Sequence, residues 1–190
     1  MNKIIWPLLL CAVLCGCGGG ETGNAVQEQY RTLETARLEA EVTSHTSTDS
    51  RTFTLLCSYD ADGDAVTTVT APGELAGLTA VVSGTDMTLR SEGLQLPAGA
   101  SLDICPANCL PYLLRALADG YVLEQSSEAL DDTPCLRLAL DTTAPGGGKV
   151  LCAVWLDAEG LFPRYAEFSR NEQVVLTVKL LAFTCTTSEG

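Results

Sequence analysis

The residues with the most specific chemistry in this sequence are Leu14-Cys15-Gly16-Cys17, which have the composition and spacing of a bacterial lipobox. In such a site a small residue precedes the cysteine that will be acylated, and an aliphatic residue lies three positions before it. Cys17 meets both conditions, whereas Cys11 and Cys15 each follow a leucine. We therefore predict that residues 1–16 are a lipoprotein signal peptide and that Cys17 is the lipid attachment site.

The segment before the lipobox has the pattern of an export signal. Lys3 supplies a positive charge, and residues 4–14 are apolar apart from the thiol of Cys11. This run is shorter than the roughly 20 apolar residues that a membrane-spanning helix needs. Secretion without lipid, after a cut near residues 16–20, is the alternative. Residues 17–24 are then predicted to form a flexible tether. Residues 25–187 are predicted to form a single domain on the outer face of the cell membrane.

The charge of the chain excludes several classes of partner. Loss of Lys3 with the signal peptide changes the formal net charge from −13 to −14. A surface this acidic repels the phosphates of nucleic acids, and no basic patch offsets it. It also repels anionic lipid headgroups, so we expect attachment to the membrane to depend on the lipid at Cys17.

Six cysteines remain in the mature chain after Cys17 is acylated. An even number in an exported protein predicts three disulfide bonds, and fifteen connectivities stay open. Free buried thiols are the alternative. A zinc site is disfavoured because one pair alone has close spacing. The candidates are Cys57, Cys105, Cys109, Cys135, Cys152 and Cys185.

Catalytic signatures are weak throughout the chain. The one histidine, His45, continues the polar face of a predicted strand, which indicates a solvated side chain. No G-x-S-x-G or S-x-x-K motif accompanies a base, and Cys105-x-x-x-Cys109 lacks the C-x-x-C spacing of thiol oxidoreductases. We predict no enzyme activity and no cofactor.

Alternating apolar residues predict many short strands. A helix is expected over residues 24–36, and a second over Leu110–Leu117 with Gly120 just past its end. The acidic run Asp60–Asp64 invites a calcium-binding hypothesis, but it lacks the length of a calcium loop, and a hairpin turn explains it. The strands expected are 38–42, 53–59, 65–70, 78–82, 87–91, 94–96, 102–104, 121–125, 136–140, 150–156, 161–170 and 173–184. The fold class predicted is α+β, with about eleven strands in a large curved antiparallel sheet.

One short motif links the chain to a known family. Val154-Trp155-Leu156-Asp157 followed by Gly160-Leu161-Phe162-Pro163-Arg164 resembles the LolA/LolB-like lipoprotein carriers, in which an aromatic-aliphatic-Asp strand end precedes a turn and a Pro-basic strand start. The order of elements over residues 25–185 is also similar to that family.

The resemblance implies an unclosed β-barrel whose concave face is apolar and is covered by the N-terminal helix and a mid-chain lid helix. Carriers of this kind bind acyl chains or lipoproteins there without a cofactor. The side chains that would line the cavity are Leu38, Val42, Phe53, Leu55, Tyr59, Leu110, Leu113, Leu114, Leu117 and Leu138.

Two departures from the family leave two hypotheses open. The chain keeps its own lipobox, and six cysteines could fix the lid in place. The first hypothesis is a membrane-anchored lipoprotein that handles acyl chains or lipoproteins. The second is a scaffold or activator of an envelope protein, as similar lipidated LolA-like proteins of spore-forming bacteria suggest. Apolar pattern cannot distinguish a lined cavity from a packed one.

Overall fold

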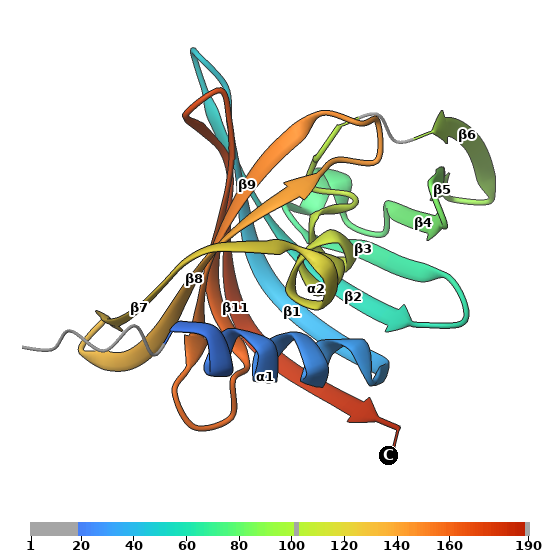
Figure 1. Ribbon diagram of the computed structural model, residues 1–190. Helices are drawn as coiled ribbons and strands as arrows, with labels where there is room; N and C mark the ends of the chain where they lie inside the picture. The colour runs from blue at the N-terminus through green and yellow to red at the C-terminus, as the bar shows by residue number, and fades with distance from the viewer. Residues whose placement is uncertain (1–18, 101–102, 189–190) are drawn as a thin grey trace, which may run out of the picture.

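The computed structural model describes residues 19–100 and 103–188, which form one strongly curved antiparallel sheet with two helices (Figure 1). The strand order is β6-β5-β4-β3-β2-β1-β11-β10-β9-β8-β7, so the first and last strands pair at the centre and β6 and β7 are the free edges. The predicted signal peptide and Cys17 lie outside the described residues. The strands are β1 Leu33–His45, β2 Ser50–Asp60, β3 Ala65–Ala71, β4 Thr79–Ser83, β5 Asp86–Ser91, β6 Leu94–Ala100, β7 Tyr121–Leu130, β8 Thr133–Thr143, β9 Lys149–Asp157, β10 Pro163–Arg170 and β11 Gln173–Thr187.

Strict alternation places the apolar side chains of the central strands on the concave face. Leu38 of β1 pairs with Cys57 of β2 and Phe183 of β11, and Val42 pairs with Phe53 and Val178. Because side chains point to opposite faces at successive positions, these pairings bring apolar positions of three strands together; the register of β1 with β11 shifts once, between Glu39 and Ala40. The expected α+β class with an unclosed antiparallel sheet is thus confirmed.

Helix α2 (Cys109–Asp119) covers this concave face. The loop before it is held by Asn108, whose Oδ1 accepts a hydrogen bond from the Cys105 backbone N–H at 2.9 Å. The helix ends where the Gly120 N–H donates to the carbonyl oxygen of Ala116 at 2.8 Å. Gly120 is required here because a Cβ would lie 2.5 Å from that same oxygen.

Helix α1 (Gly19–Arg31) lies across the opening of the sheet, with Val26 and Tyr30 buried. Its polar side chains bind distant backbone: Gln27 donates to the carbonyl of Gly120 at 2.6 Å, and the Tyr30 hydroxyl donates to that of Leu161 at 3.0 Å. The short η1 (Gly73–Leu75) is the remaining helical segment of the described chain.

Several boundaries differ from the sequence-based expectations. Helix α1 includes residues 19–24, which were expected to belong to the tether. The helix ends at Arg31, earlier than expected, because strand β1 begins at Leu33 and not at Leu38. Of the strand expected at 102–104, residues 103 and 104 are irregular and lead into α2. The Asp60–Asp64 hairpin is confirmed: Asp60 accepts backbone hydrogen bonds from Asp62 and Gly63. Within the described residues no helix has the length and apolarity to cross a membrane.

Candidate functional site: the concave face and the β7 edge

The ten residues predicted to line a cavity do come together on the concave side of the sheet. Four belong to α2, and the others come from β1, β2 and β8. Phe53 and Tyr59 are partly buried at the margin of this cluster. The other eight are buried and contact one another: Leu38, Val42, Leu55, Leu110, Leu113, Leu114, Leu117 and Leu138.

These side chains fill the space between α2 and the sheet. Leu113 and Leu117 have no exposed surface, and neither lines any of the described grooves. The Tyr112 ring packs on Phe168 with centroids 5.8 Å apart, and its hydroxyl lies 2.6 Å from Oγ1 of Thr142. The predicted cavity residues are therefore a packed core in this structure.

Open grooves lie around that core. One of about 450 Å³ opens on the concave side beside β7, between Thr22 at the start of α1, strands β7 and β8, and the β9–β10 turn. We call this the β7 groove. It is lined by Thr22, Gln125, Ser127, Glu128, Ala129, Pro134, Cys135, Leu136, Ala158 and Leu161. A second groove of about 520 Å³ includes the exposed Phe162 and Leu181. A third, about 400 Å³, lies between α2 and the end of β8.

The motif that carried the family resemblance builds the β9–β10 turn. The Asp157 carboxylate accepts hydrogen bonds from the N–H groups of Glu159 and Gly160, at 3.0 and 2.9 Å, and lies 3.6 Å from Nη1 of Arg164. These backbone hydrogen bonds, with a smaller contribution from Arg164, hold the pKa of Asp157 below its usual value. The conformation of the turn explains why an acidic residue ends this strand.

On the convex face, Arg137 is the centre of a charged and aromatic cluster that spans β7, β8 and β9. Its guanidinium lies 5.3 Å from the Trp155 ring centroid and contacts Glu124 at 3.1 Å and Glu128 at 3.8 Å. The Trp155 indole N–H donates to Glu128 at 3.0 Å. Sequence reasoning missed this cluster because its members are brought together by strand pairing: Arg137 is the direct partner of both Ser126 and Trp155.

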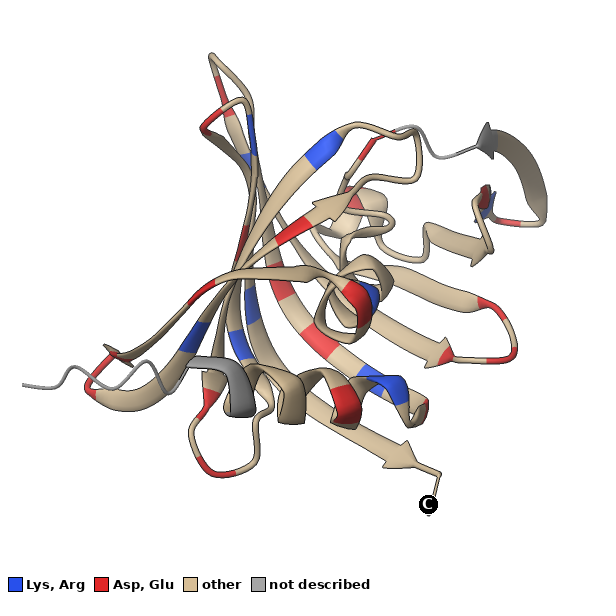
Figure 2. Cartoon of the chain, in the orientation of Figure 1, with Lys and Arg blue, Asp and Glu red and all other residues tan. Residues whose placement is uncertain are grey.

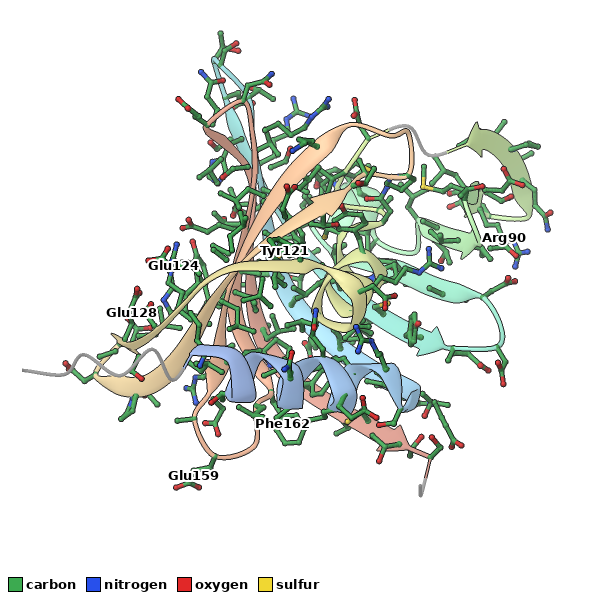
Figure 3. All side chains as sticks on the ribbon, viewed as in Figure 1. Arg90, Tyr121, Glu124, Glu128, Glu159 and Phe162 are labelled. Atoms are coloured by element: carbon green, nitrogen blue, oxygen red, sulfur yellow. The ribbon has the colours of Figure 1, made fainter. Side chains whose placement is uncertain are left out.

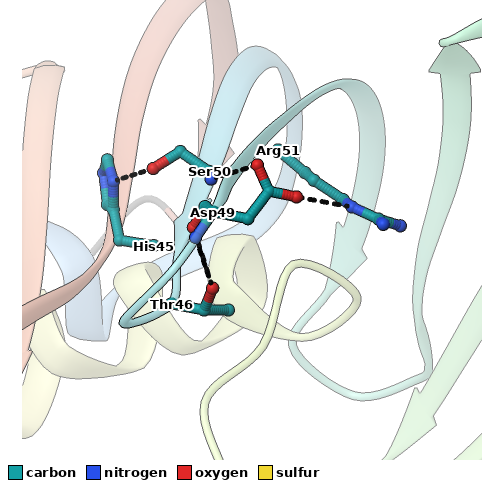
Figure 4. Close-up of polar contacts among 5 residues, drawn as sticks. All are labelled: His45, Thr46, Asp49, Ser50 and Arg51. Carbon is teal, nitrogen blue, oxygen red and sulfur yellow. Dashed lines mark hydrogen bonds and ion pairs between the residues drawn. The ribbon is translucent and has the colours of Figure 1, made fainter.

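His45 is the last residue of β1 and lines none of the described grooves; its polar surroundings are drawn in Figure 4. Its ring nitrogens contact the hydroxyls of Ser50 at 3.1 Å and Thr177 at 3.2 Å. The neighbouring carboxylate of Asp49 accepts from the Ser50 backbone N–H and pairs with Arg51, so it does not orient the imidazole. A histidine without a carboxylate partner or a substrate groove lacks the geometry of a catalytic triad.

The six cysteines are free thiols in this structure, and their pairing stays a prediction. Burial raises the pKa of Cys57 to about 11, and it also raises the pKa values of Cys109 and Cys152. Cys152 pairs with Leu140 on the concave face, whereas Cys135 alternates with Leu136 and belongs to the convex face. A bond between Cys135 and Cys152 is therefore excluded by geometry.

Acidic side chains dominate the turns at the ends of the strands, in keeping with the net charge (Figure 2). In the described part of the chain no group of three or more histidine, cysteine or acidic side chains is arranged to hold a metal ion.

Neither a family model nor a curated protein sequence matches the chain. Solved structures do. A DUF1329 family protein from Desulfovibrio piger aligns with a TM-score of 0.52 at 13% identity, covering 90% of this chain and 94% of the other. An uncharacterized conserved protein from Thermus thermophilus aligns with a TM-score of 0.52 at 9% identity, covering 90% of each chain.

A LolA superfamily protein from Nitrosomonas europaea aligns with a TM-score of 0.47 at 12% identity, covering 88% of this chain and 94% of the other. At such identities the likeness concerns the fold alone. The open sheet with its N-terminal and mid-chain helices has the element order that the sequence predicted.

Proposed function

We propose that this protein is a membrane-anchored, extracytoplasmic lipoprotein that acts by binding another envelope protein and catalyses no reaction itself. The observation that carries the proposal is the packed concave face. The side chains that a carrier would offer to an acyl chain already contact one another between α2 and the sheet. A LolA-like sheet with a filled interior has its outer surfaces and edges left for recognition.

The energetics of opening the interior support this choice. Leu110, Leu113 and Leu117 are fully buried beneath the helix. Exposing each leucine costs about 2 kcal/mol, so displacement of α2 would require a ligand to recover roughly 6 kcal/mol from these three side chains before any net binding. A partner that binds the surface meets no such cost.

The anchor restricts which partners can be reached. The proposed attachment site, Cys17, precedes the first described helical residue, Gly19, by two positions. Two residues span at most about 7 Å, so the domain would lie close to the bilayer and meet proteins of the same membrane. Replacing Cys17 with Ser should abolish labelling by an alkyne fatty acid and release the folded domain from membranes. A variant that stayed membrane-bound would contradict the anchor.

The partner role is tested with the lipidated chain in its own membrane. A photo-crosslinking residue should form an adduct with a discrete envelope protein from at least one of the exposed positions Leu123, Leu96 and Phe162. The buried Leu113 is the matched control and should give none. If no exposed position yields a specific adduct while the protein is folded and anchored, the proposal is wrong.

Acyl-chain handling is the second candidate, and the β7 groove favours it. The groove has the size of a small-molecule site and is lined in part by Leu136 and Leu161. Mass spectrometry of protein purified from membranes, together with titration by a fluorescent fatty acid, separates the two candidates. Stoichiometric lipid, displaced by a bulky residue at Ala129, would favour this second function.

A further inference from the structure

We propose that the β7 edge is the docking site and that its occupant is an extended segment of the partner protein in which basic and apolar side chains alternate. This inference rests on the proposed partner-binding function and names the surface and the chemistry of the ligand. The added segment would become a twelfth strand, held by main-chain hydrogen bonds to β7.

The first argument is the state of the edge itself. β7 ends the sheet and is ten residues long, and it contains neither proline nor glycine. From Glu124 to Leu130 its register with β8 is regular, and no hydrogen bond among the described residues uses its backbone on the side away from β8. Long, regular edges of this kind are rare because they invite pairing with another chain.

The opposite edge is protected in a way that β7 is not. β6 contains Pro97, which has no N–H to donate and is typical of strands that must not be extended. The two edges therefore differ in their capacity to accept a strand, although both expose apolar side chains, with Leu94 at 70% exposed and Tyr121 at 72%.

The second argument is charge. Glu124 and Glu128 project from the convex side of β7 and are substantially exposed, although both contact Arg137 (Figure 3). One guanidinium opposite two carboxylates leaves this side of the edge acidic. A strand added beside β7 would place every second side chain next to these carboxylates, where lysine or arginine is favoured.

The same charges disfavour a second copy of this chain as the occupant. Antiparallel pairing of two β7 strands would bring glutamates of one copy beside glutamates of the other, and like charges across strands destabilise pairing. The net charge of −13 adds to this repulsion. Charge complementarity thus selects a basic segment of a different protein.

The third argument is the β7 groove, which lies along the same edge and which Glu128 also lines. Ser127 and Ala129 alternate with the glutamates and line the β7 groove together with Leu136 and Leu161. Helix α1 contributes Thr22 to its wall, and Gly23 lies against Val122 and Gln125 at one end of the groove. The groove is therefore placed to receive the intervening side chains of an added strand, and its aliphatic floor favours valine or leucine.

The test uses the mature lipidated protein in nanodiscs and a synthetic peptide of alternating lysine and valine, matched in length to β7. Calorimetry should detect binding of this peptide. A peptide of alternating glutamate and valine should not bind. The lysine peptide should also fail to bind when every second backbone nitrogen is methylated, because one of its edges then has no N–H groups to donate to β7. Equal binding of the glutamate peptide overturns the charge argument, and equal binding of the methylated peptide overturns strand addition.

Variants test the residues named. Glu124→Gln and Glu128→Gln keep the acceptor oxygens near Arg137, and each should weaken the lysine peptide roughly two- to fivefold. The matched control, Glu74→Gln, removes one charge from the exposed η1 segment and should leave binding unchanged. Thermal unfolding verifies that each variant is folded. Equal losses in all three would mean that only net charge matters, and the site would be wrong.

Crosslinking in cells separates this inference from the proposed function. Adducts from Leu123 should map by mass spectrometry to a segment with alternating basic and apolar residues, and Leu96 on β6 should give none. If envelope proteins are captured from Leu96 or Phe162 and not from Leu123, the partner function stands and the β7 assignment is wrong. Homodimeric adducts from Leu123 would also overturn it.

Discussion

Replacing Leu113 with alanine measures whether the concave face is a packed core or a lined cavity. Leu113 is fully buried between α2 and the sheet. Truncating a leucine in a packed interior removes its transfer free energy and leaves a cavity, which costs about 2–5 kcal/mol. We expect the free energy of unfolding to fall by about 3 kcal/mol, because neighbours on both the helix and the sheet restrict collapse. In a domain of this size such a change lowers Tm by about 6–12 °C.

Urea unfolding of the Cys17→Ser protein gives the measurement. Trp155 is the single tryptophan left after removal of residues 1–16, so its fluorescence reports on the sheet, and the denaturant slope should not change. Leu94→Ala is the matched control, since this leucine is 70% exposed, and its cost should stay within about 0.5 kcal/mol.

Two results would refute a packed interior. One is a cost for Leu113→Ala below about 1 kcal/mol, comparable to that of the exposed control. The other is a large increase in the Tm of the wild-type protein on addition of a long-chain fatty acid, because a ligand that binds the native state stabilises it by mass action. Either outcome would return the acyl-carrier hypothesis to first place.

Local geometry gives four more predictions. Gly120→Ala should destabilise the protein by about 1–3 kcal/mol in urea, because the added Cβ would lie 2.5 Å from the Ala116 carbonyl oxygen; a neutral effect would mean that the end of α2 moves freely. Asp157→Asn should loosen the β9–β10 turn at neutral pH, seen as faster amide exchange at Glu159 and Gly160. In the native protein the pKa of Asp157 is lowered, so the contribution of its carboxylate to stability is complete above the unfolded carboxyl pKa near 4 and is lost as pH falls through the lower folded value. Equal amide exchange in the variant and the wild type at pH 7 would contradict this role. Non-reducing peptide mapping should find no disulfide bond between Cys135 and Cys152. Alkylation of Cys57 at pH 8 should be slow until urea is added, since burial raises the pKa of this thiol to about 11. Rapid labelling of the native protein would show that the thiol is accessible.

Much of the fold follows from side-chain alternation. Large apolar residues recur at every second position from Phe53 to Tyr59 and from Leu136 to Leu140, and the pleat of a strand converts that period directly into one buried face. The stripe from Leu110 to Leu117 and the terminating Gly120 predicted α2 for a similar reason, because both are properties of a single helical segment. The parity of Cys135 with Arg137 likewise placed that thiol opposite the apolar face.

The boundary between α1 and β1 was harder to predict. Leu33 and Ala36 fit a helical stripe as well as a strand, and the choice was made by pairing: Leu33 and Ala36 have partners on β11, so the strand extends to Leu33. Local pattern contains no information about a partner that lies about 150 residues away in the chain, which is why the helix was predicted to end too late.

The sequence alone therefore indicated most of the elements and the acidic surface, because each depends on residues that are neighbours in the chain, and the lipid anchor at Cys17 stays a prediction from the same kind of local pattern. Only the tertiary structure decided that the leucines of α2 fill the interior, since packing depends on distances between elements and not on their periodicity. Strand order also decided which segment would be an edge. Among the described residues it left one side of β7 without a strand partner, where Glu124, Glu128 and the β7 groove lie together.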